Sequence, residues 1–271
     1  MKYKLAAADL DGTLLDRSSQ ITDATVAAVK AAQEAGLVFT ICTGRAQSTV
    51  VMGYIERLGL SCPVITYNGA MLIKPDGETV YRRDLEDADA VEAYEAGTER
   101  GTDMIVWADN KLYFSKITRE TAFYRTFYPD ADLTVIGAPD EIYDIVKRGI
   151  TKIIYVSSPE LTDDNQRFVD EHFARGIVGF RSSPNYIELV HKDVSKGEAL
   201  LRLAEYYGVP RELTVAFGDE KNDIPMIEAA GLGVAMANAV PELKAVADYV
   251  TLSNAEDGVA AALYEMLAGR L

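Results

Sequence analysis

Short apolar runs alternate with helical patterns in the first third of the chain, and this alternation limits the possible folds more than any other feature. Residues 2–10, 37–43 and 62–68 are typical of buried strands. Residues 22–36 and 47–59 between them have the spacing of helices. A strand–helix–strand order indicates parallel strands covered by helices on both faces, and the last third repeats it. We therefore predict an α/β fold with a doubly wound, Rossmann-like parallel sheet.

Helix ends are also marked in the sequence. In the first helical pattern, Thr22 or Asp23 is a suitable N-cap, since both side chains can accept a hydrogen bond from a free backbone N–H group. Gly36 is a suitable stop, because glycine readily takes the left-handed conformation that ends helices.

The middle of the chain differs from its two ends. It contains an acidic helical pattern, several tyrosines and a pattern typical of a β-hairpin that turns near Asp109 and Asn110. We predict that residues 84–185 form a separate α/β domain, inserted into a doubly wound domain made of residues 1–83 and 186–271.

Charge and apolar content exclude several classes of partner. The 271 residues include 27 basic and 42 acidic ones, so the net charge is −15. Nucleic acids and anionic membrane surfaces are disfavoured as partners by this charge. Asp9 interrupts the first apolar run, and no run reaches the ~18 residues of a membrane span. The chain has only two cysteines, Cys42 and Cys62, which fits a reducing compartment, so we expect a cytoplasmic protein. We expect a monomer or a weak homo-oligomer.

Four of the predicted core strands are followed by residues that can carry chemistry. In an open α/β sheet, ligands bind at the carboxyl ends of the strands. The groups that follow the strands are Asp9 with Asp11, Thr43-Gly44-Arg45, Asn68-Gly69, and Gly218-Asp219 with Asn222-Asp223. Lys196 begins a predicted helix between the last two of these groups.

The residue types favour a phosphate ester and a metal ion. Asp9 and Asp11 would repel each other unless a cation lies between the motifs. A phosphate dianion would be repelled as well, since two unit charges 4 Å apart cost about 4 kcal/mol at an effective dielectric constant near 20. Asp9 and Asp219 offer the hard oxygen ligands that suit Mg²⁺, and Lys196 adds a positive charge for the phosphoryl group. We expect Mg²⁺ as the cofactor.

Together these motifs resemble those of the haloacid dehalogenase-like phosphatases, specifically the Cof-type branch (type IIB) with a large α/β cap. The resemblance covers essentially the whole chain. It rests on DLDGT at 9–13, TGR at 43–45, YNGA at 67–70, VSKG at 194–197 and GDEKND at 218–223. It implies a catalytic core with residues 84–185 as the inserted cap. It also implies a Mg²⁺-dependent phosphatase that hydrolyses small phosphorylated metabolites, such as sugar phosphates, through an aspartyl-phosphate.

The resemblance also assigns roles to individual residues. Asp9 would be the nucleophile, and Asp11 would be the general acid and base, with its backbone carbonyl on the metal. Asp219 would bind the metal directly, and Asp223 would bind or support it. The groups expected to hold the phosphoryl group or the substrate are Thr43, Gly44, Asn68, Lys196 and Asn222.

Several of these residues also have plain structural interpretations. The DLDGT segment could be a turn, Thr43 could cap the next helix, and Lys196 could be a solvated residue at a helix start. Asn68-Gly69 is a strong hairpin signal, so substrate contact and a structural turn are equally open for Asn68. Arg45 could reach the substrate or form a salt bridge. The two histidines, His172 and His191, are expected to have no catalytic role.

Two other functions are compatible with the motifs. A phosphomutase or phosphotransferase would pass the phosphoryl group to a second alcohol, and it needs basic cap residues for a second anionic group. Arg119, Arg125 and Arg181 are available but form no evident cluster. A non-enzymatic phosphate-sensing module would be phosphorylated stably and would need no cap.

Overall fold

The computed structural model describes residues 1–271, except for the side chain of Thr49. These residues form two compact units. The core unit contains residues 1–45, 51–81 and 195–271, and the insert unit contains residues 46–50 and 82–194. The insert unit continues past residue 185, where the predicted insertion ends, because the next strand pairs within it.

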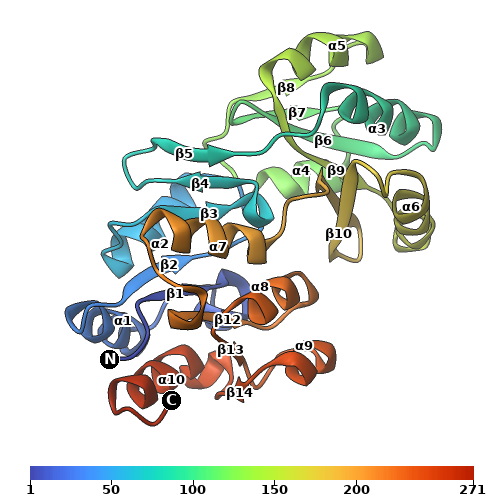
Figure 1. Ribbon diagram of the computed structural model, residues 1–271. Coiled ribbons are helices and arrows are strands. Elements are labelled where there is room, and N and C mark those ends of the chain that lie inside the picture. Colours follow the sequence, from blue (N-terminus) through green and yellow to red (C-terminus); the bar gives the residue numbers. More distant parts are fainter. The chain divides into compact units, whose positions relative to one another are not determined.

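The main sheet of the core unit is parallel and has the strand order β14-β13-β12-β1-β2 (Figure 1). Strand β1 lies between β2 and β12, so the chain winds outward from β1 in both directions. This arrangement confirms the predicted doubly wound α/β fold. The strands are β1 (Leu5–Ala8), β2 (Val38–Ile41), β12 (Thr214–Gly218), β13 (Leu232–Ala235) and β14 (Tyr249–Val250).

A small antiparallel sheet extends the core unit beyond β2. It has the order β3-β4-β5, and Cys42 bridges in parallel to Ile65 of β3. The turn between β3 and β4 is the segment η2 (Tyr67–Gly69), so Asn68-Gly69 lies in a hairpin turn, as the hairpin signal indicates. The three strands are β3 (Val64–Thr66), β4 (Met71–Ile73) and β5 (Thr79–Arg82).

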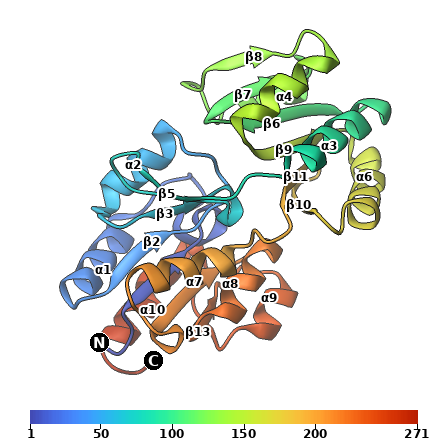
Figure 2. The ribbon, with the colours of Figure 1, turned by 45° about the horizontal axis from the view of Figure 1, so that its top comes forward.

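Helices cover both faces of the main sheet (Figure 2). Helices α1 and α10 pack together, and α7 packs on α8. As predicted, Thr22 caps α1 by accepting a hydrogen bond from the Thr25 N–H group (3.1 Å), and Gly36 follows the helix with φ +89°. The helices are α1 (Asp23–Glu34), α2 (Thr49–Leu58), α7 (Lys196–Tyr206), α8 (Ile224–Ala229), α9 (Pro241–Val246) and α10 (Gly258–Leu267).

Large apolar side chains from both sheet faces fill the core. Leu5, Phe39 and Phe217 are fully or almost fully buried. Burial of each of these side chains stabilises the folded protein by about 1.5–3 kcal/mol. Strand β1 is buried along its whole length, as expected of a central strand in a parallel sheet. The core thus fixes the carboxyl end of β1, where the DLDGT motif begins.

The insert unit is built on a sheet with the order β10-β11-β9-β6-β7-β8. As predicted, β6 and β7 form a hairpin that turns at Asp109 and Asn110, which have φ +49° and +57°. The strands are β6 (Asp103–Ala108), β7 (Lys111–Phe114), β8 (Leu133–Val135), β9 (Ile150–Val156), β10 (Ile177–Ser183) and β11 (Tyr186–His191).

Helices of the insert unit bury one continuous hydrophobic cluster against this sheet. The cluster includes Tyr94 of α3, Tyr155 of β9 and Val169 of α6. Helix α4 packs on β6, where Trp107 donates a hydrogen bond to the hydroxyl of Tyr124 (3.0 Å). The helices are α3 (Asp87–Glu99), α4 (Arg119–Arg125), α5 (Ile142–Ile145) and α6 (Pro159–His172). In the part of the chain that the structure describes, no helix has both the length and the apolar content of a membrane span.

Candidate active site

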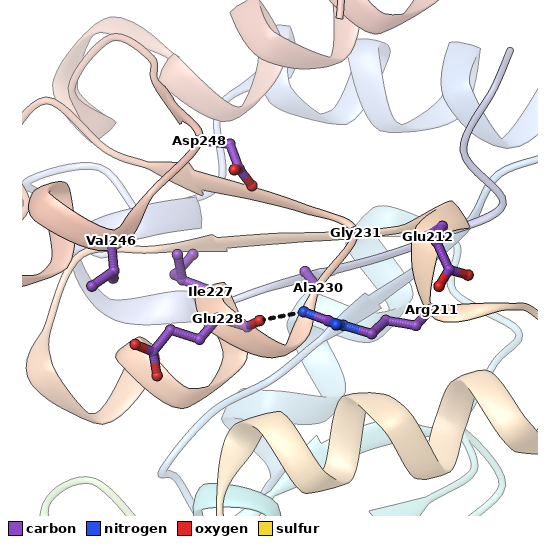
Figure 3. A pocket seen from close by; sticks show the side chains of 8 residues that line it. All are labelled: Arg211, Glu212, Ile227, Glu228, Ala230, Gly231, Val246 and Asp248. Atoms are coloured by element: carbon purple, nitrogen blue, oxygen red, sulfur yellow. Dashed lines mark hydrogen bonds between the residues drawn. The ribbon is translucent and has the colours of Figure 1, made fainter.

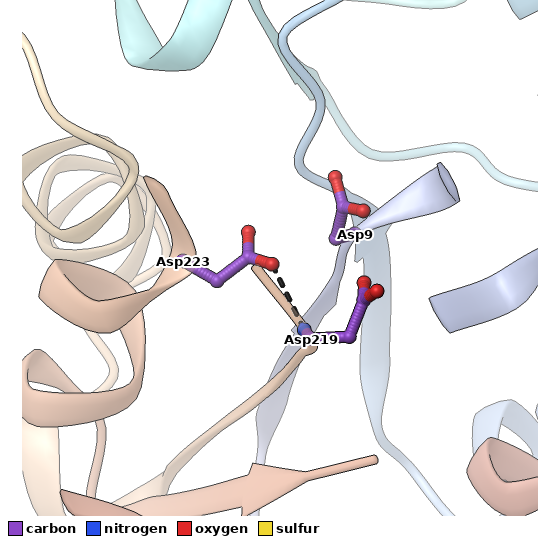
Figure 4. Close-up of side chains that lie close together, drawn as sticks. All are labelled: Asp9, Asp219 and Asp223. Carbon is purple, nitrogen blue, oxygen red and sulfur yellow. Dashed lines mark hydrogen bonds between the residues drawn. The ribbon is translucent and has the colours of Figure 1, made fainter. Parts of the chain in front are cut away.

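Asp9, Asp219 and Asp223 meet at the carboxyl edge of the main sheet (Figure 4). Asp9 follows β1 and Asp219 follows β12, and these two strands are adjacent and parallel. Asp223 ends the short 3-10 segment η6 (Lys221–Asp223). Each carboxylate offers an oxygen atom within 4.8 Å of the others, and all three residues are buried. The sheet therefore brings together carboxylates that lie far apart in the sequence.

Lys196 lies among these carboxylates. Its Nζ atom is 2.6 Å from Asp9 Oδ1 and 2.5 Å from Asp223 Oδ1, and the residue is 1 % exposed. Burial alone would lower the pKa of Lys196, but the charges of Asp223 and Asp9 outweigh burial and raise it. The solvated helix-start interpretation is therefore wrong for Lys196, and this side chain is a fixed cation.

If all three carboxylates were ionised, they would carry more negative charge than Lys196 balances. Burial raises the pKa of Asp9 well above its ordinary value, although Lys196 opposes this effect. Burial also raises the pKa of Asp219 to about 7, against the lowering effect of a hydrogen bond from Thr13. A cation near these oxygen atoms would remove the cost of ionising them. The buried, all-oxygen donor set fits a hard divalent metal ion.

The DLDGT motif forms a tight turn against Asp219. In the segment η1 (Leu10–Leu14), Gly12 has φ +81°, and a Cβ atom on it would lie 2.1 Å from Asp219 Oδ2. The hydroxyl of Thr13 donates a hydrogen bond to Asp219 Oδ1 (2.8 Å). The motif therefore supplies Asp9 and also orients Asp219. Thr13 is part of this motif, but its place in the sequence alone indicates no role for its hydroxyl.

Asn238 is a second residue that the sequence analysis misses. Its Nδ2 atom donates to the carbonyl oxygen of Gly12 (2.8 Å) and lies 3.4 Å from Asp219 Oδ2. Asn238 comes three residues after the end of β13, so it also follows the carboxyl end of a strand of the main sheet. The rule that ligands bind at strand ends could have identified it.

Asp11 lies outside the group of three carboxylates. Arg45 binds it with two hydrogen bonds, Nε to Oδ2 (2.8 Å) and Nη2 to Oδ1 (2.6 Å). The Asp11 side chain is 56 % exposed. Of the two interpretations left open for Arg45, the structure has the salt bridge. This planar pairing with two hydrogen bonds is the geometry typical of a guanidinium–carboxylate pair.

Thr43, Asn68 and Asn222 lie in loops beside the carboxylates. Thr43 is 1 % exposed, and its hydroxyl accepts a hydrogen bond from the Arg45 N–H group (3.1 Å). Helix α2 starts only at Thr49, so Thr43 does not cap it. Asn222 Nδ2 donates to Asn68 Oδ1 (3.1 Å).

The two histidines belong to the insert unit, whereas the three carboxylates belong to the core unit. His172 pairs with Glu92 (3.0 Å) on the surface. His191 is buried at the end of β11, where the guanidinium of Arg83 lies 2.7 Å from its Nε2 atom.

A hollow of about 480 Å³ lies elsewhere on the core unit (Figure 3). Arg211 and Glu212 line it just before β12, and Gly231 lines it just before β13. These positions are the amino ends of the strands, the edge opposite the carboxylates. Arg211 donates hydrogen bonds to the carbonyl oxygens of Ala229 (2.7 Å) and Glu228 (2.8 Å). Its guanidinium therefore caps the C-terminal end of α8. We assign the chemistry to the carboxylate edge.

Comparison with known proteins agrees with this geometry. The sequence model of haloacid dehalogenase-like hydrolases matches residues 6–263. Phosphatase YwpJ of Bacillus subtilis is 32 % identical over 97 % of this chain and 100 % of its own. The 5-amino-6-(5-phospho-D-ribitylamino)uracil phosphatase YitU of the same organism is 29 % identical over 97 % of each chain.

The fold has solved counterparts. The HAD subclass IIB sugar phosphatase BT4131 superposes with a TM-score of 0.83, at 22 % identity, over 97 % of this chain and 98 % of its own. This likeness confirms the type IIB fold. The matched length, the identity with named phosphatases and the common fold lead to one conclusion: the chain belongs to the haloacid dehalogenase-like hydrolases and is a phosphatase of the Cof-type branch.

Proposed function

We propose that this phosphatase depends on Mg²⁺ and hydrolyses small phosphorylated metabolites through an aspartyl-phosphate on Asp9. The observation that carries the proposal is the buried Lys196, held between Asp9 and Asp223 beside Asp219. A nucleophilic carboxylate needs fixed positive charge to approach a phosphate dianion. Lys196 supplies one such charge, and the family generally uses a divalent metal for the rest.

The metal would be held by the carboxylates of Asp9 and Asp219 and by the backbone carbonyl of Asp11. Bound Mg²⁺ would neutralise part of the charge on the phosphoryl oxygens. Asp223 would support the site from behind, because its oxygen atoms are already engaged. Oδ1 accepts from Lys196, and Oδ2 accepts from the N–H groups of Asp219 (3.0 Å) and Glu220 (3.1 Å).

In the first step, an Asp9 carboxylate oxygen attacks phosphorus and the bond to the ester oxygen breaks. The leaving alcohol takes a proton from the carboxyl group of Asp11. Lys196 stabilises charge on the transferring group, with Thr43, Gly44 and Asn222 around the phosphoryl oxygens. The products of this step are the free alcohol and a phosphorylated Asp9.

In the second step, water attacks phosphorus and Asp11 accepts a proton from it. The bond between Asp9 and phosphorus breaks, which returns the Asp9 carboxylate and releases inorganic phosphate. The second step begins from the carboxylate form of Asp11, which is the form that Arg45 binds. Arg45 is therefore suited to hold Asp11 between the two proton transfers.

The substrate class follows from chemistry and from the named relatives. Two of them act on phosphorylated polyhydroxy compounds, a ribityl phosphate for YitU and sugar phosphates for BT4131. We therefore propose sugar or polyol phosphates as substrates. The insert unit, as the cap, would contact the leaving group of the substrate. The cytoplasmic location and the monomeric or weakly associated state remain predictions.

The proposal is tested by phosphate release from about a hundred phosphorylated metabolites, with Mg²⁺ or with EDTA. Asp9→Asn is assayed in parallel, because it keeps the size of the side chain and removes the nucleophile. We expect Mg²⁺-dependent release that favours sugar or polyol phosphates and is lost in Asp9→Asn and in EDTA. Release that persists in Asp9→Asn would contradict the covalent mechanism. Isomerised sugar phosphate without free phosphate would identify a phosphomutase, and stable phosphorylation without turnover would identify a sensing module.

A further inference from the structure

The turn Tyr67–Gly69 has an unusual backbone. Tyr67, Asn68 and Gly69 have φ values of +53°, +58° and +107°, so three consecutive residues have positive φ. This conformation suits Gly69 and is tolerated by Asn68, but for a bulky residue such as Tyr67 it costs about 1–3 kcal/mol. Tyr67 and Asn68 are also buried, at 1 % and 2 % exposure. Surrounding contacts must therefore hold the turn in place.

One set of contacts joins the turn to the loop of Thr43. The Tyr67 N–H group donates to the carbonyl oxygen of Arg45 (3.0 Å), and the Asn68 N–H group donates to that of Thr43 (3.0 Å). A Cβ atom on Gly44 would lie 2.8 Å from Asn68 Oδ1, so the Asn68 side chain lies directly against Gly44. The turn and the proposed phosphoryl-binding loop are thus fixed to each other.

A second contact joins the turn to the start of α7. A Cβ atom on Gly69 would lie 2.3 Å from the carbonyl oxygen of Ser195, which is the N-cap residue of that helix. Only glycine permits this approach, because the obstacle is rigid backbone. Lys196 is the next residue, so the turn packs against the residue that directly precedes the buried ammonium group.

The third contact comes from the Asn68 side chain. Its Oδ1 atom accepts the hydrogen bond from Asn222 Nδ2 (3.1 Å). Asn222 directly precedes Asp223, which binds Lys196 and the backbone N–H group of Asp219. One turn of the core unit therefore touches the loops of Thr43, Lys196 and Asp223 at once.

We propose that Asn68 is a positioning residue whose side-chain oxygen, through Asn222, sets the spacing between the Thr43–Gly44 loop and the Lys196–Asp223 pair. This inference rests on the proposed phosphatase function and adds a role that the sequence left open. In this role the Oδ1 atom of Asn68 accepts a hydrogen bond from Asn222 and not from the substrate. The residue must tolerate left-handed backbone and must also present an oxygen acceptor, and asparagine meets both conditions.

Asn68→Gly separates the side chain from the backbone. Glycine keeps the left-handed conformation without strain and removes only the amide. We expect kcat to fall about 100-fold, the effect of a small misplacement of reacting groups, while KM changes little. Asn68→Asp retains an acceptor oxygen for Asn222 and should recover most of the lost kcat. A residue that donated a hydrogen bond to phosphate would behave in the opposite way, because aspartate would repel the substrate and raise KM.

Asn222→Ala tests whether Asn68 acts through its partner. Because the two side chains form one contact, the double variant Asn68→Gly/Asn222→Ala should be no slower than the slower single variant. Ser19→Gly is a matched control, since Ser19 also has left-handed backbone (φ +57°) but lies in an exposed loop. Its kcat should equal that of the wild type. Thermal unfolding of every variant shows whether it is folded at the assay temperature.

The inference is overturned if Asn68→Gly retains wild-type kcat, if the two single losses multiply in the double variant, or if Asn68→Asp is slower than Asn68→Gly. Absence of phosphate release by the wild-type protein would instead contradict the proposed function. In that case, calorimetric titration with orthovanadate in Mg²⁺ tests the positioning role separately. Weaker orthovanadate binding by Asn68→Gly than by wild type would support that role, and equal binding would overturn it.

Discussion

Each unit of the protein contains a buried lysine, and the two differ in their surroundings. Lys196 in the core unit and Lys152 in the insert unit are 1 % and 0 % exposed. Lys196 opens a helix at the edge of a sheet and binds Asp9 and Asp223, which come from two other loops. Lys152 lies inside β9, and its Nζ atom is 3.0 Å from Oε2 of Glu188 on the neighbouring strand β11.

The comparison separates two uses of a buried charge. Burial of an ion pair costs desolvation energy in both places, so neither pair is evidence of stability by itself. Lys196 lies where loops from different strands meet, a position that a ligand can reach in α/β sheets. Lys152 lies within strand β9, which is buried along its whole length. We infer that the first lysine serves chemistry and that the second fixes the packing of its sheet.

The largest expected effect is the loss of turnover in Lys196→Met. Methionine preserves most of the packing volume but removes the charge that stabilises the transferring phosphoryl group. Loss of a positive group in this role costs about 10³- to 10⁵-fold in kcat in phosphoryl-transfer enzymes. Steady-state phosphate release measures this change, with Lys74→Met as the control because Lys74 pairs with Glu78 on the surface. Turnover near the wild-type rate would remove Lys196 from the mechanism.

Lys152→Met should affect stability instead of chemistry. It leaves Glu188 buried without its ammonium partner, which costs about 3–5 kcal/mol in comparable cases. Urea unfolding gives the free energy of unfolding. The double variant Lys152→Met/Glu188→Leu should recover most of that loss, since two apolar side chains replace the pair. If the double variant stays as unstable as the single one, the ion pair has a role beyond packing.

Thr13→Val should weaken the metal site by an intermediate amount. Valine has nearly the same shape as threonine but lacks the hydroxyl that orients Asp219. Loss of a contact behind a metal ligand typically costs about 10- to 100-fold in metal affinity. The Mg²⁺ concentration for half-maximal activity should rise accordingly, and saturating Mg²⁺ should restore much of the rate. An unchanged Mg²⁺ requirement would argue against Asp219 as a metal ligand.

The smallest effect concerns His191 in the insert unit. Burial and the Arg83 guanidinium lower its pKa below 6.5, although Asp193 and Glu86 oppose this and Lys192 adds to it. As the pH falls through 6.5, the unfolded chain takes up the proton first, so stability decreases. His191→Gln should make the free energy of unfolding less dependent on pH below 6.5. A steeper dependence in the variant would show that the sign is wrong.

Much of the fold follows from local sequence signals. Thr22, Gly36 and the turn at Asp109-Asn110 were predictable because each signal depends on neighbouring residues alone. Strand β11 was not predicted. Only Pro184 and Asn185 separate it from β10. Its polar residues Glu188 and His191 interrupt the apolar run that would indicate a buried strand, although both are buried in the structure.

Some contacts of the site also follow from the sequence, and others do not. Strand order predicts that Asp9 and Asp219 meet, because parallel strands end at one edge. The side-chain contacts of Arg45 with Asp11 and of Thr13 with Asp219 depend on the path of a single turn. Sequence spacing does not specify that path, so these contacts required coordinates.

The order of the chain has a consequence for its synthesis. Asp9 and its partner Lys196 are 187 residues apart, and the whole main part of the insert unit lies between them. A ribosome that adds about 5–20 residues per second needs roughly 10–40 s to make this stretch. The insert unit can therefore fold before β12, the neighbour of β1 in the complete sheet, has been synthesised. During that interval the nascent chain already has a complete insert unit, but its nucleophile has no ammonium beside it, and the enzyme gains activity only with its last third.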